Sequence, residues 1–282
     1  MIDKIYLEIT NICNLDCSFC HKTNRRKQLI TLDEFETLTD KLEGKAKFLY
    51  FHLMGEPTLH PLLPTFIKIA RDKQFIPMLT TNGSLLSEKG GALLENLPYK
   101  TSISLHAPDA NPKFADENYL SSCIDFAKKA VERGGIVVLR LWNLGTDADN
   151  AEILKKLHQA FPDEWSPVRG RNSIRILPKL YLEYDDHFEW PDHSREEIDK
   201  DQETFCYALR NQIGVLVDGS VVPCCLDHAG NIVLGNLFES SLDEILASPR
   251  AKAIYDGFTN HEAVEPLCKR CGYAIITKQY RK

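Results

Sequence analysis

Over the first two thirds of the chain, apolar residues recur with strand-like and helix-like spacing in alternating segments. Strands are expected at 4–10, 47–53, 76–81, 101–107, 136–143 and 173–177. Helices are expected at 31–44, 61–73, 118–133 and 149–160. Strand–helix alternation predicts an α/β fold built on a parallel sheet. Six units are too few to close an eight-stranded barrel, so we expect a partial (β/α)6 TIM-like barrel, with a doubly wound sheet as the alternative.

The predicted strands are apolar at one set of alternate positions and polar at the other. The apolar set comprises Ile5, Leu7, Ile9, Leu49, Phe51, Leu53, Ile103, Leu105, Leu139, Leu141, Ile174 and Ile176. The polar set includes Tyr6, Glu8, Thr10, Tyr50, His52, Thr80, Asn82, Ser102, Ser104, His106, Arg140, Trp142 and Arg175. Successive side chains point to opposite faces of a strand, so one face would pack under helices. Because burying so many unpaired polar groups would be costly, the other face is expected to line a polar cavity.

Composition narrows the class of protein further. The chain has 282 residues, of which 43% are hydrophobic, and a formal net charge of −6. No apolar run is long enough to span a membrane, and the N-terminus lacks a signal-peptide pattern, so a cytoplasmic location is expected. The negative charge makes nucleic acid an unlikely partner, because such binding depends on neutralising phosphates. In the cytoplasm thiols stay reduced, so crowded cysteines indicate metal or redox chemistry rather than disulfides.

Three of the nine cysteines are crowded into CNLDCSFC, directly after the first predicted strand. Cys13, Cys17 and Cys20 can hold three corners of a [4Fe–4S] cube and leave the fourth iron open to a small molecule. The alternative is a zinc ion held by the same cysteines together with His21.

This CxxxCxxC spacing, with Phe19 before the third cysteine, resembles the signature of radical S-adenosylmethionine (radical SAM) enzymes. Three further stretches match in order, namely MGEP (54–57), TTNG (80–83) and SLHA (104–107), and the resemblance spans residues 5 to 178. Met54 replaces the first glycine of the family's glycine-glycine-glutamate motif. The resemblance implies a [4Fe–4S] cluster that binds S-adenosylmethionine as co-substrate, and a flavodoxin- or ferredoxin-type electron donor. The implied cofactor contacts are Phe19, Gly55, Glu56, Asn82, Ser104 and, more loosely, Arg140.

His106 departs from the pattern of many relatives, which have aspartate at this position. The imidazole is expected on the polar face, where it could touch substrate and accept a proton, since its unperturbed pKa lies near neutrality. The alternative is a structural role as a hydrogen-bonded side chain inside the barrel. Cys123, alone in its predicted helix, is expected to be a buried packing residue.

A second set of cysteines follows in the last third of the chain. Cys206, Cys224, Cys268 and Cys271 form a complete set for a cluster or zinc, with Cys225 as an alternative to Cys224. IGVLVDGSVVPC reads as a hairpin that turns at Asp218-Gly219, and 241–249 reads as a short helix. The spacing resembles the SPASM domain in its shortened form, twitch, which implies one auxiliary [4Fe–4S] cluster. A zinc ribbon is the alternative. We therefore expect a radical SAM domain at 1–180, a linker at 181–205 and an auxiliary-cluster domain at 206–282.

An auxiliary cluster near the site could accept an electron from a substrate radical, so the resemblance implies an oxidoreductase that performs a two-electron oxidation. The substrate would be a small molecule or a peptide. One alternative is a peptide-modifying enzyme, either a maturase or a cross-linking enzyme. Its recognition module is expected to be a separate protein, because the sequence begins almost directly on the first predicted strand. From another class, a non-catalytic zinc-binding interaction module would also explain the cysteines.

Overall fold

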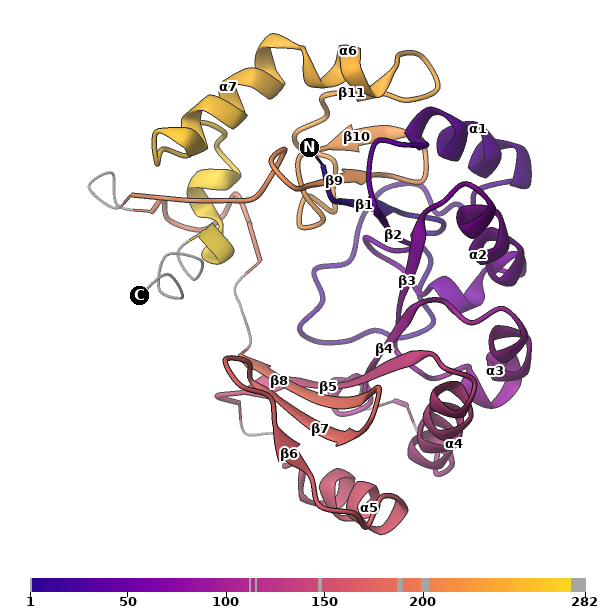
Figure 1. Ribbon diagram of the computed structural model, residues 1–282. Helices are drawn as coiled ribbons and strands as arrows, with labels where there is room; N and C mark the ends of the chain where they lie inside the picture. The colour runs from indigo at the N-terminus through magenta and orange to yellow at the C-terminus, as the bar shows by residue number, and fades with distance from the viewer. Residues whose placement is uncertain are drawn as a thin grey trace.

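The computed structural model describes residues 2–111, 113–114, 116–146, 149–186, 190–198 and 203–274. Its centre is a run of six parallel strands in the order β1-β2-β3-β4-β5-β8 within a larger mixed sheet. The bounds are β1 Lys4–Leu7, β2 Phe48–Tyr50, β3 Ile76–Thr81, β4 Lys100–Ser104, β5 Ile136–Leu144 and β8 Leu180–Asp186. Figure 1 shows these strands as an open arc, so the predicted partial (β/α)6 barrel is confirmed.

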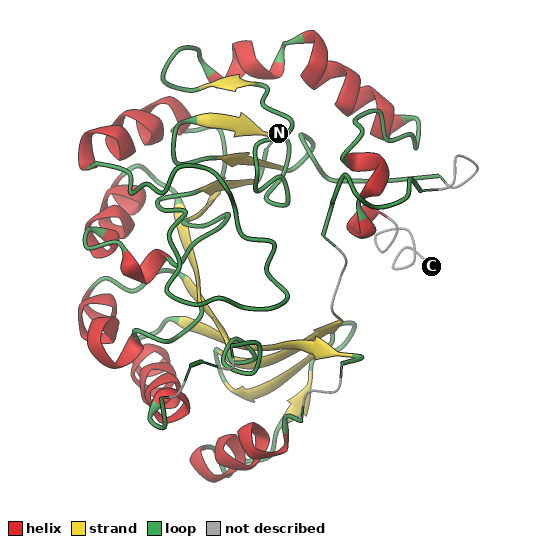
Figure 2. Ribbon diagram, turned by 180° about the vertical axis from the view of Figure 1, so that it is seen from behind, coloured by secondary structure: helices red, strands yellow, loops and turns green. Residues whose placement is uncertain are grey.

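Helices cover the outer side of the arc (Figures 1 and 2). Their bounds are α1 Leu32–Leu42, α2 Leu63–Asp72, α3 Leu86–Glu95, α4 Tyr119–Glu132 and α5 Ala151–Ala160, with a short 3-10 helix η1 at Pro57–Leu59. The start of α1 follows from its sequence, because Thr31 and Glu34 form a reciprocal capping box. No helix among the described residues combines the length and apolarity that crossing a membrane would require.

The sequence did not predict α3, which lies between the third and fourth strands. Gly90 and Gly91 lower its intrinsic helix propensity, so local sequence gives a weak signal there. Packing decides instead: a Cβ atom added to Gly90 would lie 3.2 Å from the ring of Phe126 in α4. The glycine thus allows α3 to approach α4 closely.

The expected sixth parallel strand was assigned to the wrong segment. Residues 173–177 do form a strand, β7 Ser173–Leu177, but it runs antiparallel to β8 and pairs with the short β6 Ser166–Pro167. The sixth parallel strand is β8, which occupies the beginning of the expected linker 181–205. Because β7 lies toward the edge of the sheet, Arg175 is exposed rather than directed into a barrel.

The two faces of the sheet differ as the sequence pattern predicts. Among the described residues, the apolar set is almost entirely buried, with Ile5, Leu49 and Leu139 at 0% exposure. The opposite parity places Tyr6, Tyr50 and His52 together on the inner face, where their rings contact one another, and Ser102 and Arg140 each carry a buried polar atom at the same parity.

The C-terminal third continues the same sheet. Strand β9 (Gln212–Val215) pairs in parallel with β1, so that Ile5 lies opposite Ile213, and it forms the predicted hairpin with β10 (Ser220–Val222). The remaining elements are β11 Gly235–Asn236, α6 Leu242–Leu246, α7 Pro249–Thr259 and the 3-10 helix η2 Cys268–Arg270. Residues 187–189 and 199–202 of the expected linker, and 275–282 of the expected last domain, lie outside the described residues.

Candidate active site

The three-cysteine loop follows β1 at the carboxyl ends of the parallel strands. Two amide side chains reach its sulfur atoms: Asn111 Nδ2 lies 2.9 Å from Cys17 Sγ, and Asn82 Nδ2 lies 3.8 Å from Cys13 Sγ. Asn111 also accepts a hydrogen bond from the backbone N–H of Asp16, which fixes the loop between the cysteines. N–H donors to cysteine sulfur are the contacts that tune iron–sulfur thiolates, so these residues fit a cluster.

The loop Met54–Pro57 lies directly against the start of the three-cysteine loop. The backbone N–H of Glu56 donates to the carbonyl of Ile12 at 2.8 Å. Gly55 has a φ of +75°, and a Cβ atom built on it would lie 2.5 Å from the carbonyl oxygen of Thr10 and 2.8 Å from that of Ile12. This close approach of two backbones explains why glycine occupies the position.

The Glu56 carboxylate is buried at the centre of this junction. Oε1 accepts hydrogen bonds from the N–H and the hydroxyl of Thr58 and from the hydroxyl of Thr81, whereas Oε2 accepts one from the N–H of Asn82. Burial raises its pKa, and these donors oppose the rise. No ion pair involves Glu56 within the described part of the chain. A buried carboxylate held only by neutral donors suits a cationic ligand, and Oε2 retains acceptor capacity for an ammonium group.

Replacing Gly55 by alanine is expected to push the two loops apart. The left-handed conformation alone costs about 1–2 kcal/mol with a side chain, and the clash with two carbonyl oxygens adds to it. Thermal unfolding should show a lower melting temperature, and calorimetry on the reconstituted protein should show weaker S-adenosylmethionine binding. Gly91→Ala is the matched control, because nothing lies within 4 Å of its added Cβ and alanine favours a helix. Equal stability and binding in Gly55→Ala and the natural chain would contradict the assignment.

A cavity of about 340 Å³ opens beside the second and third cysteines. Its walls include Phe19, His106, Trp142 and Asn143. The Phe19 and His106 rings lie 5.3 Å apart, and the His106 Nδ1 atom lies 3.1 Å from the carbonyl of Arg140 and 3.3 Å from the N–H of Trp142. Backbone of β5 therefore holds the His106 ring at the wall of this cavity.

Arg140 and Ser104 lie opposite each other in the β4–β5 register, but the Arg140 guanidinium turns to other partners. It lies 4.3 Å from the centre of the Trp142 ring, and its Nε is 3.7 Å from Glu183. Among the described residues, Arg140 Nε, His52 Nδ1 and Ser102 Oγ are buried and form no hydrogen bond. Burial, with Arg140 and Lys100 nearby, lowers the pKa of His52 to about 3, so its imidazole is neutral. The inner face therefore presents polar atoms that suit a polar ligand.

The second set of cysteines converges on one pocket. Cys206, Cys224, Cys268 and Cys271 line it together with mainly apolar residues. Burial raises the pKa of Cys224 well above the usual range, and the neighbouring thiols raise it further. Four thiols that oppose one another's ionisation need a cation before they can act as thiolates, so the donor set fits an iron–sulfur cluster.

Cys225 does not line that pocket. Cys225 and Tyr6 instead pack against the same small apolar cluster, and the Tyr6 ring stacks on Tyr50 with centroids 4.6 Å apart. The adjacent cysteines therefore lie in different environments, with Cys224 in the cysteine pocket and Cys225 against the inner face of β1.

Zinc fits these cysteines less well than a cluster. No group of three or more His, Cys, Asp or Glu side chains among the described residues is arranged around a single metal ion. His21, the fourth ligand of the zinc alternative, stacks on Trp190 and lies 3.7 Å from Asp192. In a [4Fe–4S] cube each thiolate binds a different iron, so the sulfur atoms need not meet at one ion.

The fold and the cysteine sets define an iron–sulfur enzyme built on a partial barrel. A family model for the radical SAM superfamily matches residues 7–166, more than half of the chain, which therefore belongs to that superfamily. A model described as an iron–sulfur cluster-binding domain, SPASM, matches residues 206–272. Membership implies a [4Fe–4S] cluster with S-adenosylmethionine and auxiliary iron–sulfur binding, and the non-catalytic zinc alternative is set aside.

Two curated relatives show how far the similarity extends. A GTP 3',8-cyclase from Chlorobaculum tepidum is 36% identical over 98 residues, which are 33% of this chain and only 30% of that protein. An S-adenosyl-L-methionine-dependent 2-deoxy-scyllo-inosamine dehydrogenase from Niallia circulans is 23% identical over 287 residues, covering 98% of this chain and 95% of the relative. The cyclase thus shares one segment, whereas the dehydrogenase matches along the whole chain.

Solved structures agree with the fold. The crystal structure of BtrN in complex with AdoMet and 2-DOIA has a TM-score of 0.58 at 18% identity, covering 96% of this chain and 93% of that one. The crystal structure of Streptococcus suis SuiB has a TM-score of 0.63 at 17% identity, covering 99% and 74%. At such identities the likeness shows the fold alone.

Proposed function

We propose that the chain is an oxidoreductase that cleaves S-adenosylmethionine reductively, abstracts a substrate hydrogen with the resulting 5'-deoxyadenosyl radical, and completes a two-electron oxidation. A single auxiliary [4Fe–4S] cluster would accept the electron of the second half-reaction. Bound iron–sulfur groups supply one-electron chemistry that amino-acid side chains cannot. The observation that carries the proposal is the pocket lined by Cys206, Cys224, Cys268 and Cys271, on a segment whose strand β9 pairs directly with β1 of the barrel.

The other site residues would bind and orient the first cluster and S-adenosylmethionine. Cys13, Cys17 and Cys20 would hold the first cluster, with Asn82 and Asn111 donating to its thiolates. Backbone at Gly55 and Oε2 of Glu56 would receive the ammonium group of S-adenosylmethionine. The cavity beside Phe19 would take its adenine, because aromatic walls suit a planar ring. These roles follow the cavity, the donors and the buried carboxylate described above.

The inner face favours a polar substrate. Arg140, His52 and Ser102 each carry a buried polar atom that forms no hydrogen bond with the described residues, and such atoms are costly unless a ligand satisfies them. The dehydrogenase that matches the whole chain has a polar substrate by name, which supports the same direction. We therefore place a small polar molecule ahead of a peptide.

Anaerobic reconstitution tests the proposal. Loaded protein should contain about eight irons per chain, as two [4Fe–4S] clusters, and should form 5'-deoxyadenosine only when a reductant is present. Protein loaded with zinc instead of iron, and treated with the same reductant, is the control. A chain that takes up two zinc ions but no iron, or that forms no 5'-deoxyadenosine when fully loaded, would refute the proposal. Small-molecule and peptide candidates are then compared by substrate-dependent deuterium transfer into 5'-deoxyadenosine.

His106→Ala is expected to lower substrate turnover by about 10²-fold, the size of a typical lost acid–base group. Iron content should remain complete, because the His106 ring is held by β5 backbone, at the carbonyl of Arg140 and the N–H of Trp142. His158→Ala is the control, since that ring stacks on Trp165 at the outer helix α5. Unchanged turnover with complete clusters would leave His106 with its structural role alone.

A further inference from the structure

A buried ion pair connects the three-cysteine loop to the second cysteine segment. The Arg25 Nη2 atom lies 2.7 and 2.8 Å from the two carboxylate oxygens of Glu8. The Glu8 side chain is 0% exposed and that of Arg25 is 16% exposed. Glu8 belongs to the polar set of the first strand, and Arg25 follows Cys20 by five residues. Neither residue was assigned a role from the motifs.

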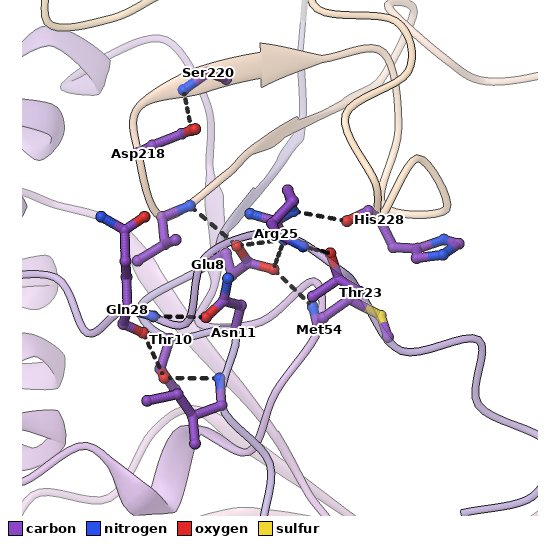
Figure 3. Close-up of polar contacts among 12 residues, drawn as sticks. Glu8, Thr10, Asn11, Thr23, Arg25, Gln28, Met54, Asp218, Ser220 and His228 are labelled. Carbon is purple, nitrogen blue, oxygen red and sulfur yellow. Dashed lines mark hydrogen bonds and ion pairs between the residues drawn. The ribbon is translucent and has the colours of Figure 1, made fainter.

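The pair joins five separate stretches of the chain (Figure 3). The Glu8 carboxylate also accepts hydrogen bonds from the backbone N–H groups of Met54 at 3.2 Å and Val217 at 3.0 Å. Arg25 donates from Nε to the carbonyl of His228 at 3.0 Å. One ion pair therefore joins the end of β1, the loop after the third cysteine, the 54–57 loop, the β9–β10 turn and the segment that follows Cys224.

A second contact joins the same two segments, the loop after the third cysteine and the segment after Cys224. The His228 ring meets the ring of His21, the residue after Cys20, edge-on with centroids 5.7 Å apart. Asp227, next to His228, lines the pocket of the four cysteines and accepts from the N–H groups of Asn231 and Ile232. The segment held by Arg25 is thus the one that forms a wall of the auxiliary pocket.

We propose that Glu8 and Arg25 are positioning residues that fix the loop of the first cluster relative to the segment of the second. Burying an ion pair is costly, and apolar replacements often give equal or greater stability. The geometry explains why charges are retained here: a carboxylate accepts from a guanidinium and two backbone N–H groups at once, and the guanidinium keeps further donors for His228. Apolar side chains could fill the space but could not join the segments. This inference rests on one part of the proposed function, namely that the second cysteine set binds a cluster.

Hydrogen–deuterium exchange on the holoenzyme tests the connection. Arg25→Met should raise amide exchange by about tenfold or more in both 21–28 and 226–232. Arg26→Met is the matched control, because Arg26 is the exposed neighbour and its side chain can be removed without affecting the pair. Arg25→Lys keeps a positive charge near Glu8 but loses the separate Nε donor, so it should raise exchange in 226–232 more than in 21–28. Faster exchange in 21–28 alone with Arg25→Met would overturn the proposal.

A double variant separates positioning from charge compensation. Glu8→Met with Arg25→Met removes both buried charges, so its melting temperature should recover relative to Arg25→Met alone. Exchange in both segments should nevertheless stay fast, and the electron paramagnetic resonance spectrum of the reduced auxiliary cluster should differ from that of the natural chain. Recovery of exchange and spectrum together with stability would mean that the pair only compensates charge, which would overturn the inference. Absence of a second cluster in the natural chain would instead refute the proposed function and leave the exchange result standing.

Discussion

Cys17→Ala is expected to abolish reductive cleavage of S-adenosylmethionine and to leave about four irons per chain, those of the second set. The cluster needs three cysteine ligands, and the variant keeps only two. Without the cluster there is no open iron to bind S-adenosylmethionine. Cys17 is the most informative of the three, because its sulfur receives the Asn111 amide at 2.9 Å and so has a fixed position in the loop. Iron analysis and chromatography of 5'-deoxyadenosine measure the two effects separately.

The control for that loss is another buried cysteine. Cys123 is 0% exposed in α4, as predicted for a packing residue, and its sulfur lies 3.9 Å from the carbonyl of Gly83. Cys123→Ala should keep about eight irons and full cleavage, at a cost of about 1 kcal/mol in unfolding free energy. If Cys17→Ala still produced 5'-deoxyadenosine, or if Cys123→Ala lost half of the iron, the ligand assignment would be wrong.

The sequence could predict those features whose signal is local. The three-cysteine spacing, the capping box at Thr31 and the hairpin at Asp218-Gly219 each lie within a few residues, and alternation along single strands showed which face of the sheet is polar. The order of the strands in the sheet was harder to predict from the sequence. Whether β7 or β8 pairs in parallel with β5 depends on the return path of the chain, and both segments have strand-like composition.

The supporting contacts of the site could not be predicted for a related reason. Asn111 lies 94 residues from Cys17, in a loop with neither strand nor helix pattern. Arg25 lies in a basic stretch that resembles an exposed loop, and only the fold shows that it is covered and paired with Glu8. Motif matching also gave Glu56 a single role. Its four hydrogen bonds, from Thr58, Thr81 and Asn82, show that it also joins the loops after β2 and β3.

Cys224→Ser and Cys225→Ser should have opposite outcomes, although the residues are adjacent. Cys224 lines the pocket with Cys206, Cys268 and Cys271, so its loss should remove the auxiliary cluster and leave about four irons per chain. Cleavage of S-adenosylmethionine should persist, because the first cysteine set is intact. Substrate oxidation should fall to background, since the proposed electron acceptor is gone.

Cys225→Ser should retain about eight irons and most of the turnover. Serine keeps a polar atom beside the Tyr6 side chain, and burial keeps that phenol protonated by raising its pKa. Iron content, 5'-deoxyadenosine and oxidised product should be measured on both variants prepared in parallel. A Cys225→Ser variant with half the iron beside a fully loaded Cys224→Ser variant would reverse the ligand assignment. If both variants contained half the iron, the contact of Cys225 with Tyr6 would be needed to hold Cys224 in the four-cysteine pocket. Cys225 would then support the cluster through Cys224 and not as a ligand.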